Sequence, residues 1–123
     1  MFKVPRNDRS ITWTQHAVMK MKQYALSEQR IRRVLRVPKR KEEAIVPGLV
    51  AVMQPASSTA KHQTEIWVMY KLIAKQSSVQ RMALQKHLAK IKIISCWRYP
   101  GISPLRQPPP IPEDILKEIH QLV

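Results

Sequence analysis

Two residues near the N-terminus have the types and the spacing for phosphate chemistry. His16 and Lys20 are four residues apart, so on a helix they would lie one turn apart on one face and could meet a single phosphate. Close to a helix start, the positive end of the helix dipole disfavours imidazolium and would keep the His16 ring neutral near pH 7. Such a ring can act as a general base. In the alternative, His16 packs beside Trp13 as a structural residue and Lys20 is simply solvated.

Two further candidates stand at the end of the last predicted strand. Arg98 could supply a cation to a substrate, and Tyr99 could supply a proton. Tyr99 precedes Pro100, however, and could equally close the edge of the sheet.

The densest group of cations lies between these two sets. The chain has 22 Lys and Arg residues against 8 Asp and Glu residues, a formal net charge of +14. Such an excess favours a polyanionic partner, of which nucleic acid is the commonest. We therefore expect phosphate contacts, rather than a plain solvated face, from one run of basic residues: Arg30, Arg32, Arg33, Arg36, Lys39, Arg40 and Lys41.

Composition argues against several other kinds of site. A lone cysteine, Cys96, excludes a disulfide framework and a multi-thiolate zinc site, and it fits a reducing compartment. Two glycines, Gly48 and Gly101, cannot build a phosphate-binding glycine loop. We expect neither a metal nor a cofactor, because no pair among the remaining histidines has metal-ligand spacing: His62, His87 and His120.

Two tryptophans could stack on bases, as in proteins that bind single-stranded nucleic acid. Trp67 and Trp97 lie in segments of alternating apolar character, however, which favours a place in the core for both.

Hydropathy indicates no membrane partner. No apolar run approaches the ~18 residues of a membrane-spanning helix, and residues 1–10 have charges but no apolar signal-peptide core. We expect a soluble cytoplasmic protein; the oligomeric state is not indicated.

The N-terminal third predicts two short helices. Thr14 and Ser27 are suited to cap helices that run to about Tyr24 and Arg36. The second helix should end there because Pro38 disfavours helical geometry at the residue before it. Since helices of about ten residues are marginal alone in water, both need a sheet to pack on.

The rest of the first 99 residues predicts strands. Strands are expected at 49–54, 64–74 and 91–99, where valine, isoleucine and aromatic residues alternate with other side chains. Residues 39–43 are expected to be a charged connector, and 75–90 a long hairpin connection with a helical alternative. The predicted fold class is α+β: two short N-terminal helices packed on a three- to four-stranded antiparallel sheet.

Residues 100–123 predict a proline-rich linker and a short amphipathic helix. Six of the ten prolines lie between Pro100 and Pro112, which favours an extended linker. The stripe Ile115, Leu116, Ile119 and Leu122 needs a surface. We expect it to cover the open face of the sheet near Trp67, Met69 and Ile73, with a groove on another chain as the alternative.

One known family resembles this pattern of helices and strands. The segment from Thr14 to Ser27, followed by Pro38 and a strand ending Ser95-Cys96-Trp97-Arg98, resembles the bacterial domain-of-unknown-function family four-two-five-eight. The matching residues are His16-Ala17, Lys20-Met21, Tyr24-Ala25-Leu26-Ser27, Pro38 and Ser95. Departures from the family pattern are Lys20 and Tyr24 in place of arginines, Ala25 in place of glycine and Ser95 in place of threonine.

The resemblance implies a fold and an activity. The family is grouped by fold with the RelE, barnase, EndoU and colicin-like ribonucleases, many of them toxins, which have two helices on a four-stranded antiparallel sheet. The leading hypothesis is therefore a small basic RNA-binding protein of ribonuclease-like fold. It could be a toxin-type, metal-independent endoribonuclease, with His16, Lys20, Arg98 and Tyr99 as catalytic residues and an acidic antitoxin protein as a second partner. The alternative is a catalytically inactive nucleic-acid-binding or protein-interaction module of the same fold, which the departures at Lys20 and Tyr24 favour.

Overall fold

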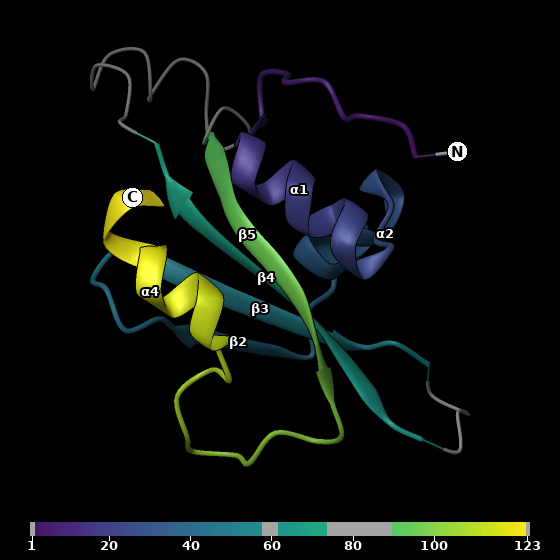
Figure 1. The fold of residues 1–123 in the computed structure, drawn as a ribbon, viewed down its shortest axis with the longest axis vertical. Helices are drawn as coiled ribbons and strands as arrows, with labels where there is room; N and C mark the ends of the chain where they lie inside the picture. The colour runs from purple at the N-terminus through teal and green to yellow at the C-terminus, as the bar shows by residue number, and fades with distance from the viewer. Residues whose placement is uncertain (1, 58–61, 74–89, 123) are drawn as a thin grey trace.

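The computed structural model describes residues 2–57, 62–73 and 90–122. In these ranges a mixed five-stranded sheet forms the middle of the protein (Figure 1). The strands lie in the order β1-β5-β4-β3-β2. β1 runs parallel to β5, and the other three neighbouring pairs are antiparallel. The strand bounds are Ile11–Trp13 for β1, Arg40–Glu43 for β2, Leu49–Pro55 for β3, Thr64–Leu72 for β4 and Ile91–Pro100 for β5.

The α+β class is confirmed, but the predicted sheet is wrong in two respects. The sheet has five strands and is not purely antiparallel. β2 has the sequence Arg-Lys-Glu-Glu, without an apolar residue, so it lacks the alternation that identifies a half-buried strand. It is an edge strand that pairs through its backbone, with Arg40 opposite Met53. The expected charged connector is therefore a strand whose charges protect an open sheet edge.

The first helix, α1 (Gln15–Tyr24), begins as its sequence predicts. The Thr14 side-chain oxygen accepts the Ala17 amide at 3.0 Å and donates to the carbonyl of Ile93 at 2.8 Å. The same side chain therefore caps the helix and ties its start to β5.

The second helix, α2 (Glu28–Arg36), also begins and ends as predicted. The Ser27 hydroxyl accepts the Arg30 amide at 3.1 Å. Together α1 and α2 cover one face of the sheet, which places both on the same side of β5 in Figure 1. The main core lies beneath them and includes Trp13, Ala17, Met21, Ile31, Val34, Val52, Ile66, Val68, Ile93 and Cys96.

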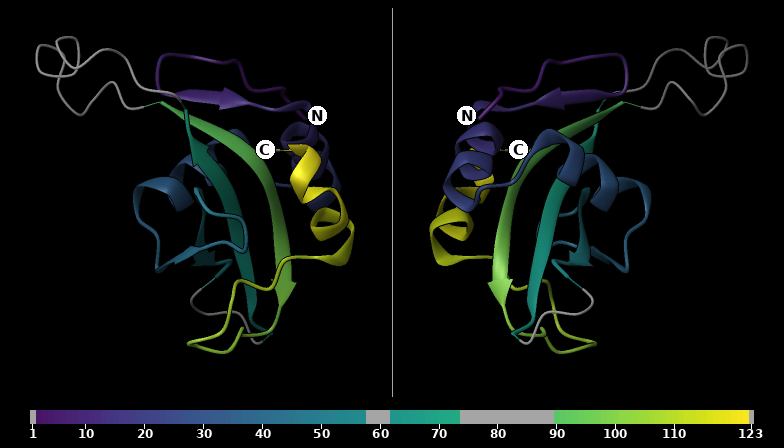
Figure 2. Two further views of the ribbon diagram at one scale, coloured as in Figure 1. Left: turned by 90° about the vertical axis from the view of Figure 1, so that its left-hand side faces the viewer. Right: turned by 90° about the vertical axis from the view of Figure 1, so that its right-hand side faces the viewer.

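The other face of the sheet is covered by the C-terminal helix, α4 (Glu113–Leu122). Ile115 and Ile119 are fully or nearly fully buried in a second core that contains Trp67 and Trp97. Figure 1 shows α4 across β5 from α1, and both views of Figure 2 show the two helices near the β5 edge of the sheet. The expectation that the tail docks on its own sheet is confirmed, although Leu116 of the predicted stripe is 39% exposed.

A buried polar network fixes the linker to the sheet before α4 begins. Glu65 is 4% exposed and accepts hydrogen bonds from the Trp67 indole at 3.0 Å, the Ser103 amide at 3.2 Å and the Ser103 hydroxyl at 2.6 Å. Arg40 donates to the same hydroxyl oxygen at 2.7 Å, and its guanidinium lies 5.2 Å from the Trp67 ring centroid. Because every one of these groups has a partner, Glu65 stays buried without an unsatisfied charge.

Part of the predicted layout falls outside the described residues. The hairpin connection expected at 75–90 lies there except for Lys90. No helix in the described ranges is long and apolar enough to cross a bilayer.

Candidate nucleic-acid interface

His16 lies in the first turn of α1, recessed against β5. Its Nε2 atom is 3.0 Å from the hydroxyl oxygen of Ser95, a hydrogen-bond distance, and its Nδ1 atom is 3.7 Å from a carboxylate oxygen of Glu118 on α4. The side chain is 13% exposed. Ser95 is fully buried, so its hydroxyl orients the ring rather than facing a substrate.

The His16 ring favours the neutral form, as expected, but the main cause differs from the expected one. Burial lowers the pKa of His16 most strongly, and the charge of Lys20 lowers it further. The carboxylates of Glu118 and Asp114 partly offset this lowering of the pKa. Desolvation, and not the helix dipole expected from the sequence, is therefore the main cause of the lowered pKa.

Lys20 is one turn from His16 on the same side of α1, as the spacing predicts. Its amine donates to the carboxylate of Asp114 on α4 and to the Gln23 side chain at 2.9 Å. The lysine side chain is 11% exposed, whereas Asp114 is 54% exposed. The predicted pair is thus brought together, but each member faces a carboxylate of the C-terminal helix.

Three participants in this arrangement were not among the predicted site residues. Tyr24 continues the four-residue spacing of His16 and Lys20, and burial together with the Asp114 charge raises the pKa of its hydroxyl. That spacing was the available signal for Tyr24. Asp114 and Glu118 carried no such signal, because only the fold brings them to α1. We call this set the α1–α4 interface: His16, Lys20 and Tyr24 of α1 with Asp114 and Glu118 of α4.

Arg98 lies at the opposite end of α1 from His16. Its guanidinium donates to the carbonyl of Tyr24 at 2.7 Å and to that of Ala25 at 3.3 Å. It therefore satisfies carbonyls that the helix end leaves unpaired. Because eight residues of helix span about 12 Å, Arg98 and His16 are too far apart to share one phosphate.

Tyr99 is separated from Arg98 by the sheet. Neighbouring strand residues point to opposite faces, and Tyr99 is a half-buried residue that packs on the core beneath α4. The four predicted catalytic residues therefore do not form one cluster. Cys96, beside α1, adds no nucleophile, because burial raises the pKa of its thiol to about 12.

Two arginines of the predicted basic run hold the fold together. Arg32 donates to the carboxylates of Glu28 and Asp8, each at 2.9 Å, and lies over the Trp13 ring. It thereby fixes the N-terminal arm to α2. Arg40, whose side chain is 9% exposed, belongs to the buried network around Ser103.

Another part of the run keeps its charge without a carboxylate partner. Arg30 donates to the side-chain oxygen of Gln54 and to the carbonyl of Pro55, both at 2.8 Å. Burial lowers the pKa of Arg30 most, and the positive charges of Arg33 and Arg98 lower it further. Gln54 accepts from Arg30 and donates to the carbonyl of Arg33 at 3.2 Å, and Gln54 and Arg98 are both in register with Ile66 of β4. The three arginines therefore belong to one surface. We call Arg30, Arg33 and Arg98 the arginine cluster. Within residues 2–57, 62–73 and 90–122, no carboxylate pairs with any of its members.

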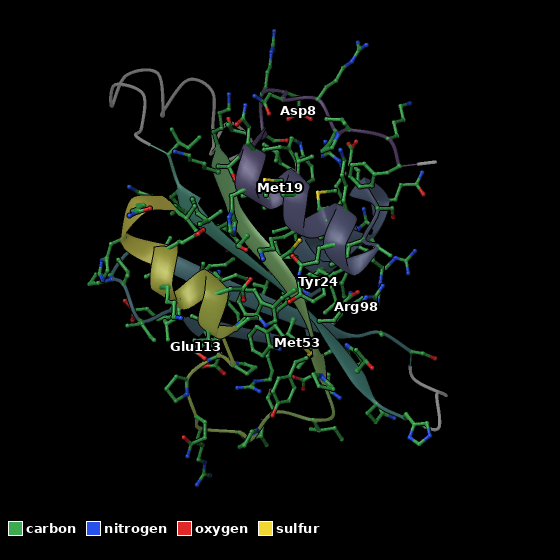
Figure 3. The ribbon with its side chains drawn as sticks, in the orientation of Figure 1. Asp8, Met19, Tyr24, Met53, Arg98 and Glu113 are labelled. Carbon is green, nitrogen blue, oxygen red and sulfur yellow. The ribbon has the colours of Figure 1, made fainter. Side chains whose placement is uncertain are left out.

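The remaining predicted cations extend this surface. Arg36 is three residues beyond Arg33 on α2, and Lys39 and Lys41 follow on the chain; all four side chains belong to exposed residues. Figure 3 shows Arg98 beside Tyr24 at the end of α1. The cluster thus begins at the α1–α4 interface and continues along α2.

The other aromatic and histidine candidates lie elsewhere. Trp67 and Trp97 stack on each other with ring centroids 6.1 Å apart and are fully buried, so the core prediction is confirmed. His62 and His120 are exposed, and His87 lies outside the described residues. Across the described ranges, no His, Cys, Asp and Glu side chains gather into a group that could hold a metal.

Comparison with known proteins leaves the site to be interpreted from its own geometry. Models of protein families, curated proteins and solved structures give no match to this chain. The resemblance in the sequence therefore stays a prediction.

Proposed function

We propose that this protein binds RNA through the phosphate backbone, with the arginine cluster as its main contact. One observation carries the proposal: Arg30, Arg33 and Arg98 lie around Gln54 and Ile66 on one surface and have no carboxylate partner among the described residues. Arginine presents donors in a rigid fork that matches phosphate oxygens. A phosphate bound there would offset the mutual repulsion of the three cations.

The expected mode of binding is tolerant of sequence. Both faces of the central strands are covered by helices, and the stacked tryptophans are buried. Backbone contacts position a nucleic acid without reading its bases. The choice of RNA over DNA comes only from the ribonuclease-like fold that the resemblance implies.

The dependence of affinity on salt tests the proposal. Each phosphate contact to single-stranded RNA contributes about −0.7 to the slope of log affinity against log salt. Arg33→Gln with Arg36→Gln should therefore flatten the slope by about 1.4. Both residues are exposed and have no side-chain hydrogen bond among the described residues, so stability should be unchanged.

A matched control removes two arginines elsewhere. Arg6→Gln with Arg9→Gln changes net charge equally on the exposed N-terminal arm. If both double variants flatten the slope equally, binding follows overall charge and the proposed site is wrong. If the parent protein does not bind RNA, the proposed function is wrong.

A second candidate function, endoribonuclease activity, is favoured by the neutral, recessed His16 beside Lys20. His16 would take the proton of a 2′-hydroxyl, the 2′-oxygen would form a bond to phosphorus as the bond from phosphorus to the 5′-oxygen breaks, and the leaving 5′-oxygen would take a proton from water, yielding a 2′,3′-cyclic phosphate. An acidic antitoxin protein would be the partner of such a toxin. His16→Gln should then lower cleavage by about 100- to 10,000-fold. If the parent protein does not cleave RNA, the endoribonuclease function is wrong and only the proposed RNA binding remains.

A further inference from the structure

The α1–α4 interface pairs two recessed nitrogen-bearing side chains, the cation Lys20 and the neutral His16, with two exposed anions. Lys20 and His16 are 11% and 13% exposed, whereas their partners Asp114 and Glu118 are 54% and 55% exposed. The carboxylates therefore lie on the solvent side of Lys20 and His16. A ligand that approaches Lys20 or His16 meets the carboxylates first.

The two pairs also match in spacing. Asp114 and Glu118 are four residues apart on α4, as His16 and Lys20 are on α1, and the pairing is antiparallel. Residues four apart on a helix lie about 5–6 Å apart at Cβ. Two negative groups in a row thus lie along two nitrogen-bearing side chains, as consecutive phosphates of a nucleic acid would.

This surface is continuous with the arginine cluster. Tyr24 lies one turn beyond Lys20 on α1, and its carbonyl accepts the hydrogen bond from Arg98. A strand of RNA that leaves the cluster at Arg98 would therefore pass Tyr24 and reach Lys20. The acidic side chains of α4, Asp114 and Glu118, lie on this path.

The carboxylates can leave Lys20 and His16 while α4 stays docked on the sheet. Half-exposed ion pairs are weak, because water and salt screen them. The docking of α4 depends instead on Ile115 and Ile119, which are buried against the sheet. A phosphate could replace a carboxylate while α4 stays in place.

We propose that the α1–α4 interface is a second phosphate site for RNA, which the carboxylates of Asp114 and Glu118 occupy in the free protein. This inference rests on the proposed RNA binding. It makes α4 an internal competitor of the ligand.

Neutralising the two carboxylates tests the inference. Asp114→Asn with Glu118→Gln should raise the affinity for a single-stranded RNA oligonucleotide by about 5- to 10-fold over the control. The salt slope should steepen by about 0.7, for one new phosphate contact at Lys20. The control, Glu43→Gln with Glu113→Gln, changes net charge equally at exposed residues outside the interface.

A third variant identifies the cation involved. Lys20→Gln should abolish the gain of the double variant but have little effect alone, because Asp114 holds Lys20 in the parent protein. If the double variant is unstable, Glu118→Gln alone provides the test, with Glu113→Gln as its control. Glu118 approaches His16 at 3.7 Å and makes no hydrogen bond to it.

The outcomes separate the two proposals. If RNA binding depends on Arg33 and Arg36 but the interface and control variants bind equally, the second site is wrong and the proposed function stands. If neither the parent nor any variant binds RNA, both are wrong.

Discussion

The α1–α4 interface and the arginine cluster lie on neighbouring surfaces, yet their cations have opposite kinds of partner. Lys20 and His16 face carboxylates of α4, whereas within the described part of the chain Arg30 and Arg98 donate only to neutral oxygens. The first surface has one cation, Lys20, against two carboxylates, whereas the second keeps its positive charge. A local excess of positive charge, rather than a count of basic residues, is therefore what directs the proposed RNA contact to the arginine cluster.

The same contrast divides the basic run itself. Arg32 and Arg33 are neighbours in sequence, but Arg32 binds two carboxylates while Arg33 pairs with none among the described residues. Mutation of the two should therefore have different consequences. Arg32 contributes to stability, and Arg33 is available to a ligand.

The largest expected effect separates the apolar docking of α4 from its charges. Ile115→Ala should lower the free energy of unfolding by about 2–5 kcal/mol, because it leaves a cavity against the fully buried Trp67 and Trp97. Leu116→Ala is the control, since the neighbouring leucine is 39% exposed, and should cost well under half as much. Chemical denaturation measures both. Equal losses of unfolding free energy in the two variants would mean that α4 does not dock through Ile115.

The next effect contrasts a buried carboxylate with the exposed ones of α4. Ser103→Ala removes two hydroxyl hydrogen bonds and leaves Glu65 and Arg40 short of a partner. A buried polar group without its partner costs about 1–3 kcal/mol, so unfolding should require correspondingly less denaturant. Asp114→Asn should cost about 1 kcal/mol at most, because that carboxylate is half exposed. A larger loss at Asp114 than at Ser103 would contradict this assignment.

A third measurement compares how much Arg98 and Arg33, two members of the arginine cluster, contribute to stability. Arg98→Gln removes the hydrogen bonds to the last carbonyls of α1 and should cost about 1 kcal/mol of stability. Arg33→Gln should cost close to nothing, since Arg33 has no side-chain hydrogen bond among the described residues. Thermal melts of the two variants at one pH make the comparison. If Arg33→Gln is the more destabilising, Arg33 has a structural role.

Features governed by local chemistry could be predicted from the sequence. Thr14 and Ser27 cap the helices because their oxygens reach amides only three residues away. The apolar pattern also identified the three long strands and a tail helix that needs a surface. These signals lie within a few residues of one another.

Features that join distant segments could not be predicted. β1 pairs with β5 over only three residues, and nothing in so short a segment fixes its direction. The Lys20–Asp114 pair joins positions 94 residues apart. For the same reason the sequence could not distinguish Arg32 from Arg33.

The smallest expected effect uses pH to isolate the α1–α4 interface. The groups that face His16 are Lys20 on its own helix, Asp114 and Glu118 on α4, and Ser95 on β5. The folded protein holds the pKa of His16 below the ordinary value of 6.5. The unfolded chain therefore binds a proton more readily, and stability should fall as the pH drops from 7 through 6.5 toward the folded pKa.

His16→Gln should lack this loss of stability, so its free energy of unfolding should approach or exceed that of the parent as the pH falls to 5. Asp114 does not obscure the difference, because the Lys20 hydrogen bond lowers the pKa of Asp114 and keeps it ionised across this range. The arginines also stay charged throughout. A pH-dependent difference between parent and variant in denaturation curves therefore comes from the interface and not from the arginine cluster. Parallel curves for the two proteins between pH 7 and 5 would mean that His16 is as readily protonated in the folded state as in the unfolded chain.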